Sequence, residues 1–203
     1  IVALVAILSH VALFGALVAW ASLCLFASTL LRIAATVAAG PDAPPKAPAL
    51  PATHLPTISI LVPLFRERNI AERLVKRLHA LDYPTDRLDI CLIVEKYDTL
   101  TRAALNATAL PPHMRQIVVP PGNLQTTPRA MTYTLDFTQG EIVGIYDAED
   151  APAPDQLRIV AAEFAAAPRD VACLQGRLDF YNPRANWLAR CFTIDYAVWF
   201  RAI

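Results

Sequence analysis

Residues 1–31 of the chain carry no charged side chain and consist mainly of alanine, valine, leucine and isoleucine. An α-helix needs about 20 apolar residues to cross the hydrocarbon core of a bilayer, and this run is longer. We therefore predict a single transmembrane helix within residues 1–39, with Arg32 at the headgroup level. A secretory signal peptide is the alternative, but its apolar region is only about 7–15 residues long and follows a basic start, which this sequence lacks. Because the chain begins with Ile1 rather than methionine, we expect it to be part of a longer protein.

The sequence changes character after residue 39. Residues 40–56 contain six prolines, which fix the backbone and remove hydrogen-bond donors, so we predict an extended linker there. The whole chain balances 18 basic against 18 acidic residues, which excludes a protein that coats nucleic acid. Four cysteines in 203 residues are too few for a disulfide scaffold. Residues 57–203 are therefore predicted to form one soluble domain of nearly neutral charge.

Short apolar runs alternate with segments of helical periodicity along this domain, which predicts the α/β class. We expect a mainly parallel sheet with helices on both faces and right-handed crossovers. Two cysteines, Cys91 and Cys173, fall inside predicted strands and are expected to be reduced core residues. The predicted strands are 58–62, 90–94, 116–119, 142–146 and 171–174, and the predicted helices are 70–81, 101–110, 128–137, 154–167 and 186–203.

Acidic residues follow several of these strands. Asp147, Glu149 and Asp150 come directly after the fourth strand, Glu95 ends the second, and Glu67 follows the first. Ligands of parallel sheets bind beyond the carboxyl ends of the strands, and adjacent carboxylates repel each other unless a cation neutralises them. Carboxylate oxygens suit Mg²⁺ or Mn²⁺, so the fourth strand end is a candidate metal site. A solvated acidic turn that caps the next helix is the alternative interpretation.

Several familiar motifs are absent. The six glycines of the chain form neither G-x-G-x-x-G nor G-x-x-x-x-G-K-[ST], so the usual dinucleotide and P-loop phosphate cradles are excluded. No G-x-S-x-G nucleophile elbow occurs either. A sugar nucleotidyltransferase would use a similar sheet and metal, but it would carry a glycine-rich loop after the first strand, which this chain lacks.

Five segments together resemble the family 2 glycosyltransferases, and most closely the bacterial cellulose-synthase-like and β-glucan-synthase-like membrane enzymes. The resemblance covers about residues 57–201 and implies a GT-A fold. It also implies inverting transfer of a sugar from a nucleotide diphosphate sugar, usually UDP-linked, to a polysaccharide or glycolipid. The segments are ISILVPLFRE (58–67), IVEKYD (93–98), TTPRAMTYTL (126–135), YDAEDAPAPDQL (146–157) and CLQGRLDFYNPRANWLAR (173–190).

The resemblance assigns roles to individual positions. It implies that the donor nucleotide contacts the first-strand motif, Glu95 where most members have aspartate, and Arg129 where lysine is common. It implies that Asp147 and Glu149 hold the metal against the diphosphate, with Asp150 able to share that role, and that Gln175 begins the acceptor side. Glu149 is longer than the usual aspartate, and Thr132 replaces a common asparagine. The residues of the first-strand motif are Pro63, Phe65 and Glu67.

The resemblance also sets expectations for the rest of the protein. The family places its general base and a Q-x-x-R-W motif later in the chain, so we expect the base downstream of Ile203 and an inactive fragment. Asp195 lies in an apolar, aromatic segment and is expected to be structural. The expected location is the inner membrane with the soluble part in the cytoplasm, and the expected partners are a nucleotide sugar, a glycan or lipid-linked acceptor and the bilayer. A non-catalytic scaffold of the same fold is the alternative.

Overall fold

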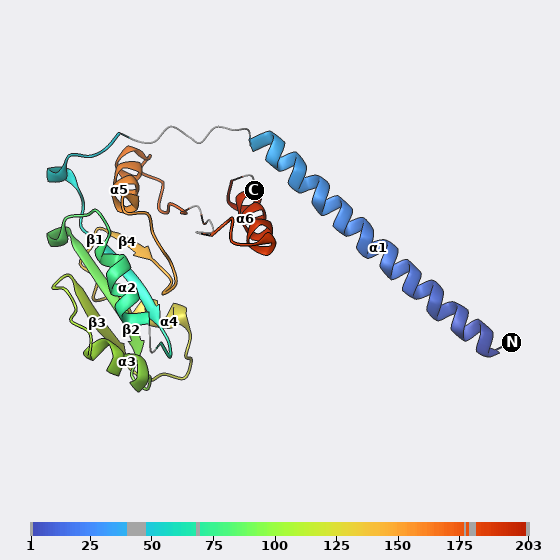
Figure 1. Ribbon diagram of the computed structural model, residues 1–203, viewed down its shortest axis with the longest axis horizontal. Helices are drawn as coiled ribbons and strands as arrows, with labels where there is room; N and C mark the ends of the chain where they lie inside the picture. The colour runs from blue at the N-terminus through green and yellow to red at the C-terminus, as the bar shows by residue number, and fades with distance from the viewer. Residues whose placement is uncertain (1, 40–47, 68–69, 177, 179–181, 202–203) are drawn as a thin grey trace. The chain divides into compact units, whose positions relative to one another are not determined.

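The computed structural model describes residues 2–39, 48–67, 70–176, 178 and 182–201 (Figure 1). Part of the predicted linker, residues 40–47, therefore lies outside the described residues, as do Arg177 and residues 179–181 of the last family-like segment. The chain divides into two compact units, which we describe separately. One unit comprises residues 45–174, and the other comprises residues 1–44 together with 175–203.

A four-stranded parallel sheet forms the centre of the larger unit (Figure 1). Its strand order is β3-β2-β1-β4, so the two strands in the middle come first in the chain. Every residue of β2 is buried, which explains why this strand reads as an almost continuous apolar run. Four of the five predicted strands are confirmed, and their bounds are β1 Ile58–Leu64, β2 Leu88–Glu95, β3 Met114–Val119 and β4 Ile142–Ile145.

A helix follows each strand of this sheet. Pro128 near the start of α4 fits the first turn of a helix, where its missing N–H has no partner to lose. The predicted helices are all present, with ends that differ by a few residues. Their bounds are α2 Ile70–His79, α3 Thr99–Asn106, α4 Thr127–Leu135 and α5 Gln156–Ala166, and two short 3₁₀ turns cover Ala52–His54 and Thr85–Arg87.

Alternate side chains of the strands build two cores on opposite faces of the sheet. Ile60, Ile90 and their even-numbered neighbours pack with α2, α3 and α5. Leu61 and Ile93 point to the other face and pack with Ala130 of α4. Burial of one such large aliphatic side chain contributes about 1.5–3 kcal/mol, so both faces favour the folded state. Helices therefore cover both faces of a parallel sheet, as the alternating pattern predicted.

The prediction of a fifth strand at residues 171–174 was wrong. These residues form no strand, and their one described backbone hydrogen bond runs from Val171 N to Pro168 O at 3.0 Å. A strand needs a neighbouring ladder, and four residues with a short apolar run cannot supply one alone. Cys173 is accordingly exposed, which corrects its prediction as a core residue, whereas Cys91 on β2 is buried as expected.

A buried polar cluster fixes the amino-terminal edge of the sheet. Asp89 on β2 accepts hydrogen bonds from Ser59 Oγ at 2.7 Å and from Arg115 Nε at 2.8 Å. Ser59 Oγ in turn accepts one from Gly140 N at 2.8 Å, which ties down the loop between α4 and β4. Burial alone would raise the pKa of Asp89, but the hydrogen bonds from Arg115, Ser59 and the Gln139 amide hold it below its usual value.

The second unit contains the helices α1, Val2–Ala39, and α6, Trp187–Arg201. The segment Ser9–Ala34 of α1 is long and apolar enough to cross a membrane, by length and composition. Arg32 near its end donates a hydrogen bond to Asp195 of α6, which gives this carboxylate a structural contact. Asn186 caps α6 by accepting a hydrogen bond from Ala189 N at 2.8 Å.

Candidate functional site at the carboxyl edge of the sheet

The carboxyl ends of β1, β2 and β4 lie at one edge of the sheet because the strands are parallel. In the pairing register, Leu64 of β1 lies opposite Val94 of β2, and Leu61 lies opposite Ile145 of β4. The segments that follow these strands are residues 65–67, 96–98 and 146–150. The topology therefore brings to one edge the three segments in which the sequence predicted a site.

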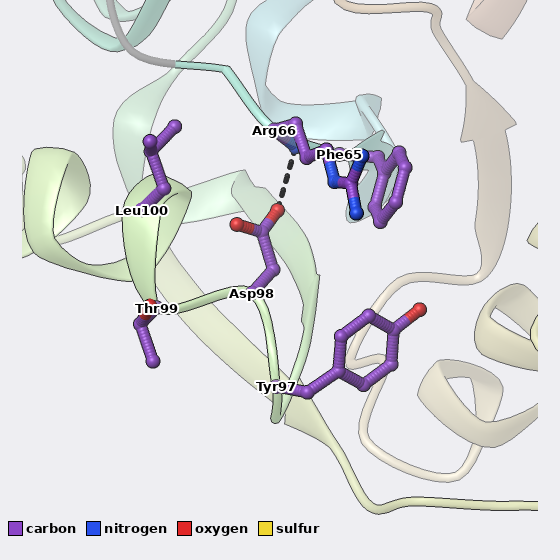
Figure 2. A pocket seen from close by; sticks show the side chains of 6 residues that line it. All are labelled: Phe65, Arg66, Tyr97, Asp98, Thr99 and Leu100. Carbon is purple, nitrogen blue, oxygen red and sulfur yellow. Dashed lines mark hydrogen bonds between the residues drawn. The ribbon is translucent and has the colours of Figure 1, made fainter.

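A cavity of about 350 Å³ lies between the segments that follow β1 and β2 (Figure 2). Phe65 and Tyr97 contribute aromatic rings that meet edge to face, with centroids 6.4 Å apart, and the two side chains are 53% and 40% exposed. The guanidinium carbon of Arg66 lies 5.1 Å from the centre of the Phe65 ring. Exposed aromatic faces beside a cation suit a planar, polar ligand such as a nucleobase. The remaining lining residues are Asp98, Thr99 and Leu100.

Asp98 holds the wall of this cavity in place. Its Oδ2 accepts hydrogen bonds from Arg66 N at 2.6 Å and from Thr101 Oγ1 at 2.7 Å, and its Oδ1 accepts one from Thr101 N at 3.1 Å (Figure 2 draws the first). Thr101 Oγ1 also accepts a hydrogen bond from Glu67 N at 2.8 Å. The buried Asp98 therefore caps α3 and orders the loop after β1 at the same time.

The loop after β1 is strained at Arg66, whose φ is 55°. This left-handed conformation costs an L-residue about 1–2 kcal/mol, so the surroundings must stabilise it. The hydrogen bond from Arg66 N to Asp98 does so. Burial alone would raise the pKa of Asp98, but hydrogen bonds from Thr101 and from the amides of Arg66 and Leu100 outweigh it and lower this pKa below its usual value.

Glu95 is the last residue of β2, and only one of its two carboxylate oxygens has a partner in the described part of the chain. The residue is 8% exposed, and its Oε1 lies 3.4 Å from Arg129 Nη1. Its Oε2 is buried and has no hydrogen-bond partner in the described part of the chain. Such an unpaired buried acceptor costs about 1–3 kcal/mol, which a hydroxyl donor from a ligand would recover.

Arg129 is positioned by the chain around Gly122. Its Nη2 donates a hydrogen bond to Pro120 O at 2.6 Å. A side chain at Gly122 would place its Cβ 2.5 Å from the Arg129 guanidinium carbon. The glycine therefore leaves the space in which this guanidinium reaches Glu95.

The acidic segment after β4 is partly ordered by its own backbone. Asp147 N donates to Asp150 Oδ2 at 2.9 Å, and Asp150 is half-buried, whereas the side chains of Asp147 and Glu149 are exposed. Burial raises the pKa of Asp147, and the nearby charges of Asp150 and Glu149 raise it further. A cation would relieve this repulsion. In the described ranges no three Asp, Glu, His or Cys side chains converge, so a cation at this segment would need further ligands such as phosphate oxygens, which Mg²⁺ commonly uses.

The structure brings some of the predicted site residues together in pairs. Glu95 meets Arg129, and Asp147 meets Asp150. Pro63 lies half-buried on β1, and Glu67 is half-buried with its amide bonded to Thr101. Gln175 is exposed and belongs to the other unit, so its place on the acceptor side stays a prediction.

Sequence reasoning assigned no individual role to four residues that shape the cavity: Arg66, Tyr97, Asp98 and Thr101. An aspartate directly before a helix is an N-cap signal, and this signal could have identified Asp98. No pattern in the sequence signals the positive φ of Arg66.

Residues 56–201 match the family described as "Glycosyltransferase like family 2". A beta-monoglucosyldiacylglycerol synthase from Synechocystis is 28% identical over 136 residues, 66% of this chain and 28% of that protein. An enzyme of the same name from Nostoc is 28% identical over 152 residues, 72% of this chain and 32% of that protein. The chain thus spans about a third of the length of these relatives.

A solved structure supports the fold. A mannosyltransferase from Pyrobaculum calidifontis, in complex with GDP-Man and Mn²⁺, superposes with a TM-score of 0.52 and 23% identity. The similarity covers 78% of this chain and 46% of that one. The family match extends over most of the chain and includes the whole carboxyl-edge site. The chain therefore belongs to the family 2 glycosyltransferases and has their GT-A fold.

Proposed function

We propose that the protein transfers a hexosyl group from a nucleotide diphosphate sugar, UDP-linked, to a glycolipid acceptor. Family membership supports the reaction class, and the name shared by the two curated relatives supports the acceptor class. A polysaccharide acceptor is the alternative that the motifs left open.

The observation that carries this proposal is the unsatisfied Oε2 of Glu95 at the base of the carboxyl edge. A ribose hydroxyl would donate to this oxygen while the nucleobase packs against Phe65 and Tyr97. Pro63 and Glu67 belong to the segment that carries Phe65, and Arg129 adds positive charge beside the same carboxylate. A nucleoside diphosphate satisfies all of these groups at once: a planar ring, a hydroxyl donor and negative charge.

A divalent cation, Mg²⁺ or Mn²⁺, is part of the proposal. Asp147 and Glu149 would hold it, with Asp150 supporting the segment, because their exposed hard oxygens and mutual repulsion suit such an ion. When bound, the ion neutralises the diphosphate and stabilises it as a leaving group. The Mn²⁺ in the mannosyltransferase complex is in line with this assignment.

Membrane attachment completes the proposal. The apolar segment Ser9–Ala34 of α1 would anchor the protein in the inner membrane, with the sheet unit in the cytoplasm, where nucleotide sugars occur. This arrangement would give the site access to a lipid-linked acceptor, with Gln175 on the acceptor side.

Calorimetric titration of the chain in mild detergent with UDP, with and without Mn²⁺, tests the proposal. We expect Mn²⁺-dependent binding of UDP that both Glu95→Gln and Asp147→Asn weaken by about 10-fold or more, equivalent to about 1.4 kcal/mol. Asp86→Asn is the matched control, because Asp86 is exposed and precedes the opposite end of β2. Its UDP affinity should equal that of the wild type.

The titration can also refute the proposal. Binding of UDP without any influence of Mn²⁺ or of Asp147 would favour a non-catalytic scaffold. Tighter binding of GDP or ADP than of UDP would overturn the donor assignment while leaving the reaction class intact.

A further inference from the structure

The acidic segment after β4 is fastened to the end of α2 through the core. Leu74 and Leu78 of α2 are buried, and Ala148 in the middle of the acidic segment, 7% exposed, belongs to the same apolar cluster. Arg77 lies between the two leucines in the last turn of α2. The helix end and the acidic segment therefore share one packed anchor.

Arg77 reaches the backbone of the acidic segment and not its carboxylates. Its Nη1 donates to Glu149 O at 2.8 Å and approaches Asp150 O at 3.4 Å. On the other side of the segment, Asp150 N donates to Asp147 O at 3.1 Å. In the described part of the chain, the carboxylate oxygens of Asp147 and Glu149 take part in no hydrogen bond or ion pair.

This choice of acceptors has an electrostatic consequence. An arginine bound to a carboxylate occupies the oxygens that a cation would need. An arginine bound to carbonyl oxygens fixes the backbone, and its positive charge partly offsets three neighbouring negative charges. The carboxylates stay available, on a segment that is already ordered.

We propose that Arg77 is a positioning residue for divalent cation binding by Asp147 and Glu149. It holds the carbonyls of the acidic segment so that the two carboxylates are arranged before the cation arrives. This role rests on the proposed function, which assigns the cation to the same segment. Partners that orient metal ligands commonly change metal affinity by about 10–100-fold when they are removed.

The test compares Arg77→Gln, Arg77→Lys and Arg73→Gln in the full chain in mild detergent. Binding of Mn²⁺ in the presence of saturating UDP is followed by electron paramagnetic resonance of the free ion, and the metal-free Tm is measured in parallel. We expect Arg77→Gln to weaken Mn²⁺ binding by about 10-fold or more. Arg77→Lys should recover part of the affinity, because a lysine can donate to one carbonyl. Arg73, exposed on the same helix, is the matched control and should leave binding unchanged.

Loss of stability must be separated from loss of positioning. Asp89→Asn removes part of the buried cluster at the opposite edge and provides a destabilised protein with an intact acidic segment. Equal Mn²⁺ affinity of Arg77→Gln and the wild type would overturn the proposal and leave the proposed function standing. A loss that Asp89→Asn reproduces in proportion to its lower Tm would overturn it as well. If the wild type binds UDP without Mn²⁺ dependence, the metal assignment fails first, and the role of Arg77 fails with it.

Discussion

Replacement of Asp98 by alanine should reduce both the stability of the sheet unit and its affinity for UDP. The carboxylate caps α3 through Thr101 N and stabilises the left-handed Arg66 through its amide. Without it, the Arg66 amide loses its described acceptor, and the loop that carries Phe65 loses the contact that fixes its conformation. One side chain thus links folding to the geometry of the cavity.

The magnitude follows from these contacts. Loss of an N-cap costs about 1 kcal/mol, and a partly buried amide left without an acceptor costs about 2 kcal/mol. We therefore expect Asp98→Ala to lower the free energy of unfolding by about 3 kcal/mol, which for a chain of this size corresponds to a Tm decrease of about 6–12 °C. The affinity for UDP should fall by about 10-fold or more, because the aromatic wall is no longer held in place.

Thermal unfolding in mild detergent measures the first effect, and calorimetric titration with UDP well below both Tm values measures the second. Asp89→Asn is the control, since it changes a buried aspartate near the opposite end of β2, at the amino-terminal edge of the sheet. It should lower the Tm as well, while UDP affinity stays within about 2-fold of the wild type, a difference below about 0.5 kcal/mol. If Asp98→Ala keeps the wild-type affinity, or if both variants lose it equally, Asp98 does not organise the cavity and the reasoning is wrong.

Three further predictions concern the surroundings of the site. Gly140→Ala should destabilise the chain by about 3 kcal/mol or more, measured as a Tm decrease, because its Cβ would press on the backbone of Ser59, which cannot easily move. Gly122→Ala should weaken UDP binding in titrations without lowering the Tm, because its Cβ would displace only the flexible end of Arg129. The lowered pKa of Asp89 means that its stabilising effect is complete above the unfolded-state pKa of about 3.9 and is lost as the pH falls through the lower folded-state value. The Tm difference between the wild type and Asp89→Asn should therefore be constant from pH 7 to about pH 5 and shrink below about pH 4.

The strands and helices could be predicted wherever a short stretch of sequence itself shows which of its residues are buried. β2 is buried along its whole length, so its apolar run identified it, and the helices between the strands showed the 3.6-residue period of one buried face. The prediction of a strand at residues 171–174 failed because strand formation there is not decided within the segment. Its few apolar residues resemble a short strand, but pairing depends on a neighbour that no local pattern reveals.

The site could be predicted only in part. The sequence shows which residue types follow each strand, but it does not show which residues from distant segments contact them. The sequence shows that Asp147 and Glu149 follow a strand, and topology then places them at the carboxyl edge. It does not show that Arg77, 72 residues before Glu149, reaches the carbonyl of that residue, or that Asp98 accepts a hydrogen bond from Arg66. Both contacts join segments that meet only in the folded chain.

Glu95 and Arg129 are a second example of residues whose relation appears only in the structure. Each departs from the residue that the family resemblance implies, Glu95 from aspartate and Arg129 from lysine, and in the sequence they are two separate departures. In the structure Arg129 Nη1 lies 3.4 Å from Glu95 Oε1, and Arg129 Nη2 also donates a hydrogen bond to Pro120 O. A glutamate extends one methylene further than an aspartate, and an arginine is longer than a lysine and offers a second donor for Pro120. The two residues therefore act as one ion pair, in which Oε2 of Glu95 has no hydrogen-bond partner in the described part of the chain. Reverting both residues, Glu95→Asp with Arg129→Lys, should accordingly preserve UDP affinity better than either change alone.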